Sequence, residues 1–204
     1  MTQNQQETPP VFIVDDDPAI RFAMQALMDS VNIEHEIYSS GDEFLESVDD
    51  HRAGCLVLDI RMPGLGGLEL QEELIKRDST LPIIFITGHG DVPMAVDAMQ
   101  KGAVDFIQKP FRDQDLLDRI REALKTDAER REEQQKHAEV AERLDRLTNR
   151  EREVFDLVVT GKPNKVIAYE LGVSQRTVEI HRARVMEKMQ ARSLADLVKM
   201  HMTA

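Results

Sequence analysis

The chain has 204 residues, which is more than one ordinary domain needs and suits two small domains. Hydrophobic residues make up 41% of the chain and charged residues 31%, a mixture that excludes a collagen-like or wholly disordered protein. No apolar run reaches the roughly 18 residues that span a membrane, and residues 1–10 show no secretory signal, so we expect a cytoplasmic protein. The single cysteine, Cys55, excludes an internal disulfide.

The formal net charge of −12 is distributed unevenly along the chain. Residues 1–124 carry 24 acidic and 10 basic residues, whereas residues 148–204 carry 7 acidic and 10 basic residues. This difference indicates two domains with different partners. The basic end permits a nucleic-acid partner, but its small positive charge is weak evidence for one.

Residues 9–125 alternate short apolar runs with helical periodicity. The runs are Val11–Val14, Ile37–Tyr38, Cys55–Leu58, Ile83–Ile86 and Val104–Ile107. They are too short for helices and too uniformly apolar for half-exposed strands, which predicts buried parallel strands. Apolar residues at helical spacing lie between them, with the last helix near residues 113–125. The pattern predicts a doubly wound α/β domain whose functional site lies at the carboxyl ends of the strands.

Residues 126–146 are interpreted as a charged helical linker. They contain no Gly or Pro, and opposite charges four residues apart, such as Glu132 and Lys136, stabilise a helix. The heptad positions that follow Leu117 and Leu124 are largely polar, which argues against a sustained coiled coil. We expect a solvated, semi-rigid helix that can continue the preceding one. A partly frayed charged tether is the alternative.

Residues 147–204 carry the signals of four short helices. The predicted helix starts are Thr148, Pro163, Ser174 and Ser193. Thr148 is followed three residues later by Glu151, which is the pattern of a capping box, and Gly172 provides a stop between the second and third helices. The segment therefore predicts a small all-α domain with a helix–turn–helix across residues 171–174.

Polar side chains follow the predicted strands at the points where these end. They are Asp15, Asp16, Asp17, Asp59, Thr87 and Lys109. Because carboxyl ends of parallel strands meet at one edge of a sheet, one pocket can collect all of them. Clustered carboxylates need a cation to neutralise them, and hard oxygen ligands suit Mg²⁺. A carboxylate beside Mg²⁺ can attack a phosphoryl group and form an aspartyl phosphate, whose oxygens a lysine and a hydroxyl would bind.

Each of these residues also has a plainer interpretation. A run of Asp residues after a strand is often a loop and a helix cap, Asp59 could begin a turn, and Thr87 could serve only as a cap. Lys109 precedes a proline and could lie on the surface. Four such placements at four strand ends favour a common site.

Four strings of this sequence resemble the four signatures of response-regulator receiver domains. They are VFIVDDDPAIR, CLVLDIRMPG, IIFITGHGD and DFIQKPF. The resemblance covers residues 9–125 and implies a flavodoxin-like, five-stranded receiver fold. It also implies a phosphoacceptor at Asp59, with Thr87 and Lys109 in contact with the phosphoryl group. Phe106 stands at the position of the family's aromatic switch residue, which turns inward as Thr87 moves toward the phosphate.

The same resemblance implies a set of ligands for Mg²⁺. The set consists of Asp15, Asp16, Asp59 and the backbone carbonyl of Arg61. Arg61 and His89 occupy the two variable positions that tune autodephosphorylation in the family. Their combined effect does not follow from the resemblance.

The predicted helix after Ser174 has two different faces. If Val178 faces the core, then His181, Val185 and Met189 share its side. The opposite face carries Arg176, Ile180, Ala183 and Glu187. An exposed isoleucine beside an arginine and a small alanine suits a major groove, where apolar side chains meet thymine methyls. Thr177 and Arg184 lie on one flank, where phosphate contacts are expected. A helix that packs against another subunit is the alternative.

Residues 147–204 resemble the LuxR/NarL-type helix–turn–helix, which implies a DNA-binding domain. By position, Glu179, Ile180 and Ala183 take the places at which the family reads bases. Asn164, Lys165 and Thr177 match its phosphate-contact positions. Some relatives hold lysine where this chain has Glu179 and Ala183, so an operator preference cannot be transferred. Together the two resemblances identify the chain as a member of the FixJ group of two-domain regulators.

These resemblances imply a transcription regulator that a sensor histidine kinase controls by phosphorylating Asp59. Phosphorylation is expected to rearrange the surface around residues 92–101 and 104–107, so that two receivers pair and set two recognition helices on promoter DNA. RNA polymerase is an expected partner, Mg²⁺ the expected cofactor, and self-phosphorylation and autodephosphorylation the expected chemistry.

Two functions from other classes stay open. One is a phosphohydrolase with an aspartyl nucleophile, which would have to turn over an external phosphate ester. The other is a receiver whose second domain binds protein instead of DNA, in which case changes to the outward face of the helix after Ser174 would leave DNA binding unchanged. The sequence also leaves open whether the unphosphorylated receiver masks the second domain or only fails to dimerise.

Overall fold

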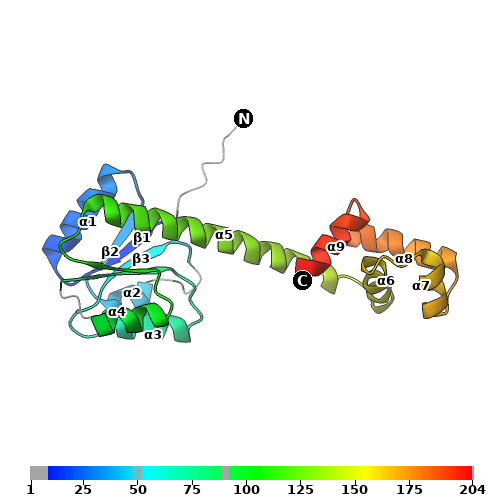
Figure 1. Ribbon diagram of the computed structural model, residues 1–204, viewed down its shortest axis with the longest axis horizontal. Helices are drawn as coiled ribbons and strands as arrows, with labels where there is room; N and C mark the ends of the chain where they lie inside the picture. The colour runs from blue at the N-terminus through cyan, green and yellow to red at the C-terminus, as the bar shows by residue number, and fades with distance from the viewer. Residues whose placement is uncertain (1–8, 48, 50–51, 89–91, 204) are drawn as a thin grey trace. The chain divides into compact units, whose positions relative to one another are not determined.

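Figure 1 shows the computed structural model, which describes residues 9–47, 49, 52–88 and 92–203. The chain divides into two compact units, the first ending at Glu129 and the second beginning at Arg130. Within the described part of the chain, no helix combines the length and the apolar character needed to cross a membrane.

The first unit is built on a parallel sheet of five strands. The strands are β1 (Val11–Val14), β2 (His35–Tyr38), β3 (Cys55–Asp59), β4 (Ile83–Thr87) and β5 (Asp105–Gln108). Their order in the sheet is β2-β1-β3-β4-β5, and every neighbouring pair is parallel. The doubly wound α/β fold expected from the alternating pattern is confirmed.

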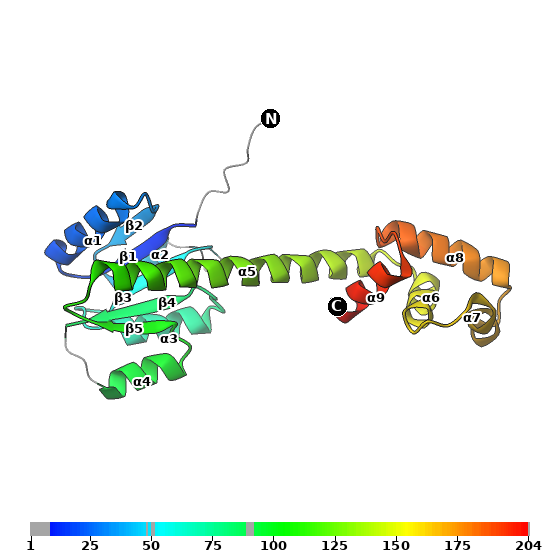
Figure 2. The same ribbon diagram turned by 45° about the horizontal axis from the view of Figure 1, so that its top comes forward.

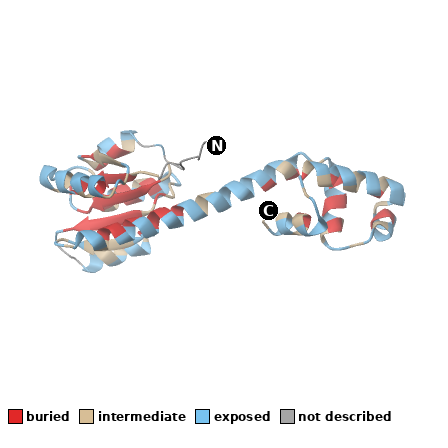
Figure 3. Cartoon of the chain, turned by 90° about the horizontal axis from the view of Figure 1, so that it is seen from above, coloured by how far each residue is buried: buried red, intermediate tan, exposed pale blue. Residues whose placement is uncertain are grey.

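Two layers of helices cover the sheet. They are α1 (Pro18–Ser30) and α5 (Asp113–Asp145) on one face, and α2 (Gly41–Ser47), α3 (Gly67–Lys76) and α4 (Val92–Gln100) on the other (Figure 2). Successive strand residues point to opposite faces, so Val11 and Ile13 pack with α1 and α5, whereas Phe12 and Val14 pack with the other three helices. The central strands are therefore buried on both sides (Figure 3).

The two edge strands are less buried than their apolar sequences predicted. Three residues of β2 and three of β5 are only half-buried, and β5 begins one residue later than expected, at Asp105. Val104 lies outside the strand and keeps 42% of its surface exposed. An edge strand has a neighbour on one side only, and a run of apolar residues does not reveal which strands lie at the edge.

Helix α5 continues without a break through the segment interpreted as a linker. It covers 33 residues and reaches Asp145. The middle of the predicted linker is mostly exposed, as expected, but residues near both of its ends are buried. Asp127 is 3% exposed and accepts a hydrogen bond from the backbone N–H of Gly54 at 3.4 Å, whereas Val140 and Leu144 are buried in the core of the second unit.

The second unit consists of the end of α5 and four short helices. They are α6 (Asn149–Val159), α7 (Asn164–Leu171), α8 (Gln175–Lys188) and α9 (Leu194–Thr203). Thr148 and Glu151 form the expected capping box, and the hydroxyl of Ser174 accepts a hydrogen bond at the start of α8. Gly172 has a φ of 66°, a left-handed conformation that glycine adopts without steric cost, and it ends α7 at the turn before α8.

Candidate functional site

The order of the strands places the first part of the site. Strand β1 lies between β2 and β3 in the sheet, so the direction of winding reverses between β1 and β3. In doubly wound folds, ligands bind at this reversal, outside the carboxyl ends of the strands. Asp15 follows β1 directly and Asp59 is the last residue of β3.

Lys109 links these two carboxylates. Its ammonium group lies 2.8 Å from Oδ2 of Asp15 and 2.8 Å from Oδ1 of Asp59. All three side chains are largely buried, with Asp15 at 4% and Asp59 at 9% exposure for the whole residue. Two carboxylates and one ammonium group leave the site with a net negative charge in a poorly solvated place.

The electrostatics of the site follow from burial and from this triad. Burial raises the pKa of Asp15 above 3.8, although hydrogen bonds from Lys109 and from the N–H of Asp17 act in the opposite direction. Burial lowers the pKa of Lys109, but its hydrogen bonds to Asp15 and Asp59 outweigh this effect and raise the pKa above 10.5. The lysine is therefore charged at neutral pH and stabilises negative charge at Asp59.

Local backbone contacts hold Asp59 in position. The N–H of Arg61 donates to Oδ2 of Asp59 at 2.8 Å. Gly67, at the start of α3, donates to the carbonyl of Ile60 at 2.9 Å, and a Cβ at Gly67 would lie 2.4 Å from the carbonyl oxygen of Asp59. Only glycine permits this close approach of the helix to the end of the strand.

The three consecutive aspartates take three different environments. Asp15 is buried in the triad, whereas Asp16 is exposed at a hollow that Arg61 also lines. Asp17 accepts a hydrogen bond from the N–H of Ala19 at 2.8 Å and caps α1. The plain interpretation of the run as a helix cap is therefore correct for Asp17.

Thr87 and Phe106 lie on the neighbouring strands β4 and β5. Thr87 ends β4 with only 2% of its surface exposed, and its carbonyl accepts a hydrogen bond from the N–H of Lys109 at 2.7 Å. Phe106 is half-buried and lines an apolar groove of about 620 Å³ with Val92, Val96 and other residues of α4. The backbone thus joins Lys109 to Thr87, and Gln108, the residue before Lys109, lines the groove. His89 lies outside the described residues.

The oxygen donors at the strand ends suit a hard divalent cation. Asp15, Asp16, Asp59 and the carbonyl of Arg61 would supply oxygen alone, the chemistry that Mg²⁺ prefers. Within the ranges that the structure describes, no three His, Cys, Asp or Glu side chains are gathered as a metal site. The donors fit the ion by type, and Asp16 would have to approach the two buried carboxylates to share it.

One residue near the site was not expected from the sequence. Arg21, on the first turn of α1, donates from Nη1 to the backbone carbonyl of Asp15 at 2.7 Å. It stabilises the loop that carries the aspartates. Arg21 is the last residue of the string VFIVDDDPAIR, but neither that string nor the spacing of six residues predicts this contact, which only the fold reveals.

The second candidate site is the outer face of α8. Val178, Val185 and Met189 are fully buried, as expected, and His181 is half-buried on the same side. The opposite face is exposed at Arg176, Glu179, Ile180, Ala183 and Arg184, with 48% of Ile180 accessible. An apolar side chain exposed among basic ones is available for a partner.

The flanks of this face carry the remaining predicted contacts. Lys165 is exposed on α7, and Asn164 begins that helix and accepts a hydrogen bond from Nη1 of Arg182 at 3.0 Å. Thr177 is half-buried, and its hydroxyl lies 2.8 Å from that of Ser174. Arg182 therefore positions Asn164, a role that the sequence alone did not suggest.

Comparisons with known proteins match both parts of the chain. The family of response regulator receiver domains matches residues 11–121, and the bacterial regulatory proteins of the luxR family match residues 145–201. The chain belongs to the response regulators that combine these two domains. This regulator is 49% identical over 193 residues to nodulation protein W of Bradyrhizobium diazoefficiens, covering 95% of this chain and 85% of that protein.

Two further comparisons extend over nearly the whole regulator. The transcriptional regulatory protein FixJ of Azorhizobium caulinodans is 44% identical over 198 residues, covering 97% of this chain and 94% of that protein. The solved structure of the response regulator StyR is 44% identical, with a TM-score of 0.90, and the match covers 97% of this chain and all of that one. The regulator is thus a two-component transcriptional regulator with a receiver and a LuxR-type DNA-binding domain.

Proposed function

We propose that the regulator is switched by transfer of a phosphoryl group from a sensor histidine kinase to Asp59. The observation that carries this proposal is the ammonium group of Lys109, which lies 2.8 Å from both Asp15 and Asp59 at the reversal of the sheet. A buried lysine held by two carboxylates supports charge development on a third anionic group at the same place. Hydrolysis of an external phosphate ester would need a substrate pocket and an acid partner beyond the receiver set, and the sequence offers neither, which favours a receiver over a phosphohydrolase.

In the proposed transfer, an oxygen of Asp59 attacks the phosphorus atom of a phosphohistidine. The P–O bond forms as the P–N bond breaks, and the imidazole leaves with the electron pair of that bond. Lys109 would pass from the carboxylate to the new phosphoryl oxygens, and the hydroxyl of Thr87 would bind another of them. Hydrolysis of the acyl phosphate by water would return Asp59 to its free form.

Asp15, Asp16, Asp59 and the carbonyl of Arg61 are the residues that would hold Mg²⁺. Bound there, the ion would neutralise the negative charges of the carboxylates and of the phosphoryl group as they approach one another. Asp15 would contribute a carboxylate that burial makes costly to ionise, since burial raises its pKa despite the hydrogen bonds from Lys109 and Asp17.

The proposed output is pairing of two receivers through the face that α4 and β5 form. This face is unusually apolar for a surface, since Val92 is 72% exposed, Val96 49% and Met99 44%. Large exposed apolar patches mark interaction surfaces. Thr87 and Phe106 would connect the site to this face, since Thr87 ends β4 and Phe106, on the neighbouring strand β5, lines the groove between α4 and β5.

A pair of receivers would bring two LuxR-type domains to one promoter. Ile180, Glu179 and Ala183 would then reach base edges in the major groove. The flanking side chains Asn164, Lys165, Arg176, Thr177 and Arg184 would contact phosphates or, for Arg176, a base. Because promoter DNA and RNA polymerase share the bacterial cytoplasm, we place the regulator there, with the polymerase as a further partner.

The experiment that tests the phosphoacceptor is the intact mass of the protein after incubation with phosphoramidate and Mg²⁺. The wild type is expected to gain one phosphoryl group, and Asp59→Asn is expected to gain none. Asp29→Asn serves as the matched control, because this carboxylate lies on α1 with 64% of its side chain exposed. A phosphoryl group on Asp59→Asn, or none on the wild type, would contradict the proposal.

A further inference from the structure

Helix α4 is attached to the rest of the receiver mainly near its carboxyl end. Ala98 is the one residue of α4 that is buried, and it has no exposed surface. Val92, Val96 and Met99 leave large parts of their surfaces in solvent. A helix that buries a single side chain is held weakly along the rest of its length, since each buried apolar group stabilises packing by about 1 kcal/mol or more.

A glutamine from the neighbouring helix reaches this attachment point. Gln71 of α3 is 1% exposed, and its Nε2 donates to the carbonyl of Ala98 at 3.1 Å. The same carbonyl accepts the N–H of Ala103 at 3.0 Å, and the N–H of Gly102 bonds the carbonyl of Met99 at 3.1 Å. These two backbone bonds form a Schellman motif, so Gln71 adds a side-chain cap from another helix to the end of α4.

A buried glutamine at this position has an energetic cost. Its Oε1 is buried without a hydrogen-bond partner among the described residues. A net hydrogen bond contributes about 1 kcal/mol, whereas an unsatisfied buried acceptor costs about 1–3 kcal/mol, so an apolar side chain of the same shape would pack at least as well. The presence of a buried glutamine that lowers stability is explained if the glutamine fixes the position of a helix, here α4.

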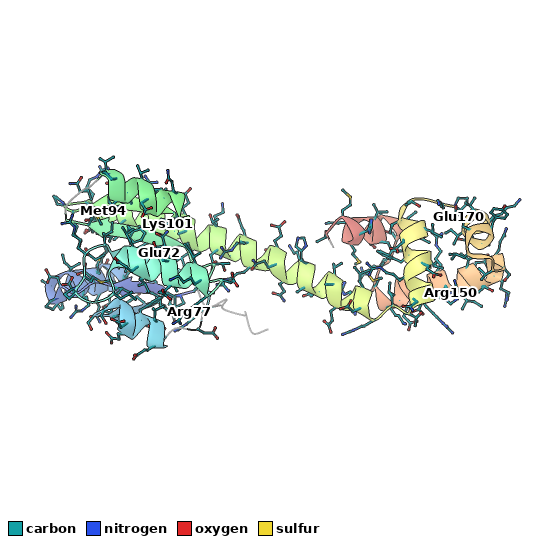
Figure 4. The ribbon with its side chains drawn as sticks, turned by 90° about the horizontal axis from the view of Figure 1, so that it is seen from below. Glu72, Arg77, Met94, Lys101, Arg150 and Glu170 are labelled. Carbon is teal, nitrogen blue, oxygen red and sulfur yellow. The ribbon has the colours of Figure 1, made fainter. Side chains whose placement is uncertain are left out.

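A surface ion pair joins the same two helices. Lys101, just after α4, contacts Glu72 of α3 at 2.7 Å and Asp97 at 2.8 Å (Figure 4). The first turn of α4 is held differently, because none of residues 92–95 is fully buried. Met94 is half-buried against the core, and Nη2 of Arg61 lies 3.9 Å from its sulfur. The two ends of α4 are therefore unequally fixed, with the firm end far from Asp59 along the helix.

We infer that Gln71 is a positioning residue, which anchors the carboxyl end of α4 so that the helix turns about Ala98 when the receiver is phosphorylated. The inference rests on the proposed function, because it concerns how that site acts on the α4–β5 face. Movement that begins at Thr87 would displace the first turn of α4, which is held more loosely. Because Gln71 keeps the carboxyl end of α4 in place, the helix would rotate about Ala98 and carry Val92 and Val96 with it.

The first test measures hydrogen exchange of α4 in the full-length protein without any phosphoryl analogue. Gln71→Met keeps the length of the side chain and removes both its donor and its acceptor. We expect exchange over residues 98–103 to rise about 3- to 10-fold, the equivalent of one hydrogen bond, with α1 unchanged and the urea midpoint equal or higher. Glu73→Gln is the control on the same helix, with less than a 2-fold effect because its exposed ion pair with Lys76 stays within α3.

The second test measures the dimer dissociation constant with and without beryllofluoride and Mg²⁺. We expect the ratio of the two constants to fall at least threefold in Gln71→Met relative to the wild type, because the helix is no longer fixed at one end in either state. An unchanged ratio overturns the hinge. Unchanged exchange over residues 98–103, or faster exchange throughout the receiver, overturns the anchor and assigns Gln71 to core packing. If the wild type itself does not respond to beryllofluoride, the proposed function fails, while the exchange result still decides the anchor.

Discussion

At the scale of single residues, the account depends on three buried charges. Asp15 and Asp59 would repel each other without Lys109, and the ammonium group lies between them at 2.8 Å from each. The raised pKa of Asp15 and the raised pKa of Lys109 have opposite consequences for stability. Folding disfavours the charged form of Asp15, whereas folding favours the charged form of Lys109.

Removing the charge of Asp15 is expected to stabilise the receiver. The pKa of Asp15 is higher in the folded protein than in the unfolded chain, so the free energy of unfolding falls as pH rises from 3.8 through the folded value. The charged form of Asp15 is therefore unfavourable for the fold at neutral pH. We expect Asp15→Asn to raise the free energy of unfolding by about 1 kcal/mol in urea titrations. The same variant should lose its response to beryllofluoride and Mg²⁺. A destabilised Asp15→Asn that still responds would contradict both expectations.

Lys109 should dominate the stability of the receiver at high pH. A lysine with a raised folded pKa contributes stability that is complete below 10.5 and is lost as pH rises through the folded value. Lys109→Met should cost about 1–3 kcal/mol at neutral pH and flatten this alkaline loss. The measurement is urea unfolding as a function of pH. Lys125→Met, which removes a lysine whose side chain is 77% exposed, should follow the wild type, and equal alkaline slopes in all three proteins would exclude this role of Lys109.

At the scale of elements, helix ends determine the shape of the DNA-binding domain. The capping box of Thr148 and Glu151 begins α6, and Lys188 at the end of α8 forms an ion pair with the same Glu151. One buried carboxylate thus joins the start of one helix to the end of another. The hydrogen bond from Lys188 and that from the N–H of Thr148 lower the pKa of Glu151 to about 2.

Glu151 should therefore control the acid stability of this domain. A lowered pKa contributes stability that is complete above 4.5 and is lost as pH falls toward about 2. Glu151→Gln keeps the shape of the side chain but removes its charge. We expect this variant to lower the free energy of unfolding by about 1–3 kcal/mol at neutral pH and to remove most of the loss of stability between pH 4.5 and about 2. Unfolding of α6 and α8 can be followed by circular dichroism. Glu153→Gln, on an exposed pair, should change little, and an equal effect of both variants would refute the prediction.

The elements that the sequence predicted are those with local signals. Apolar runs identified the strands, and Thr148, Ser174 and Gly172 marked helix ends, because caps and turns depend on neighbouring residues. The exposure of Val104 and the burial of Val140 could not be predicted in this way, since both depend on which elements become neighbours in the fold. Because Asp15, Asp59 and Lys109 each follow or end a predicted parallel strand, the sequence also predicted that they meet at one edge of the sheet. The contact of Gln71 with Ala98 follows only from the packing of α3 on α4.

At the scale of the whole molecule, the chain combines an acidic receiver with a basic DNA-binding domain. The receiver carries the triad and the apolar α4–β5 face, and the second domain carries the exposed face of α8. Each domain has its own core. Changes on the outer face of α8 should therefore leave the chemistry of the receiver intact.

Ile180→Asp tests this separation. We expect the variant to bind promoter DNA at least 10-fold more weakly, because a carboxylate would replace an apolar contact and face phosphates. Its phosphorylation and dimerisation should match the wild type. Met202→Asp is the control, because it makes the same kind of change at a side chain that is 83% exposed but lies on a different helix, α9. The affinity is measured by titrating labelled promoter DNA and recording its fluorescence anisotropy. An unchanged affinity of Ile180→Asp would instead favour a protein partner for this face.

The measurement that tests the central claim most directly is molar mass by light scattering, with and without beryllofluoride and Mg²⁺. The wild type and Asp59→Asn are compared at the same concentration. The account predicts that the wild type changes from monomer to dimer on addition of the analogue and that Asp59→Asn remains a monomer. A mass that stays constant in the wild type, or that doubles in both proteins, would contradict the claim that Asp59 controls pairing of the receivers.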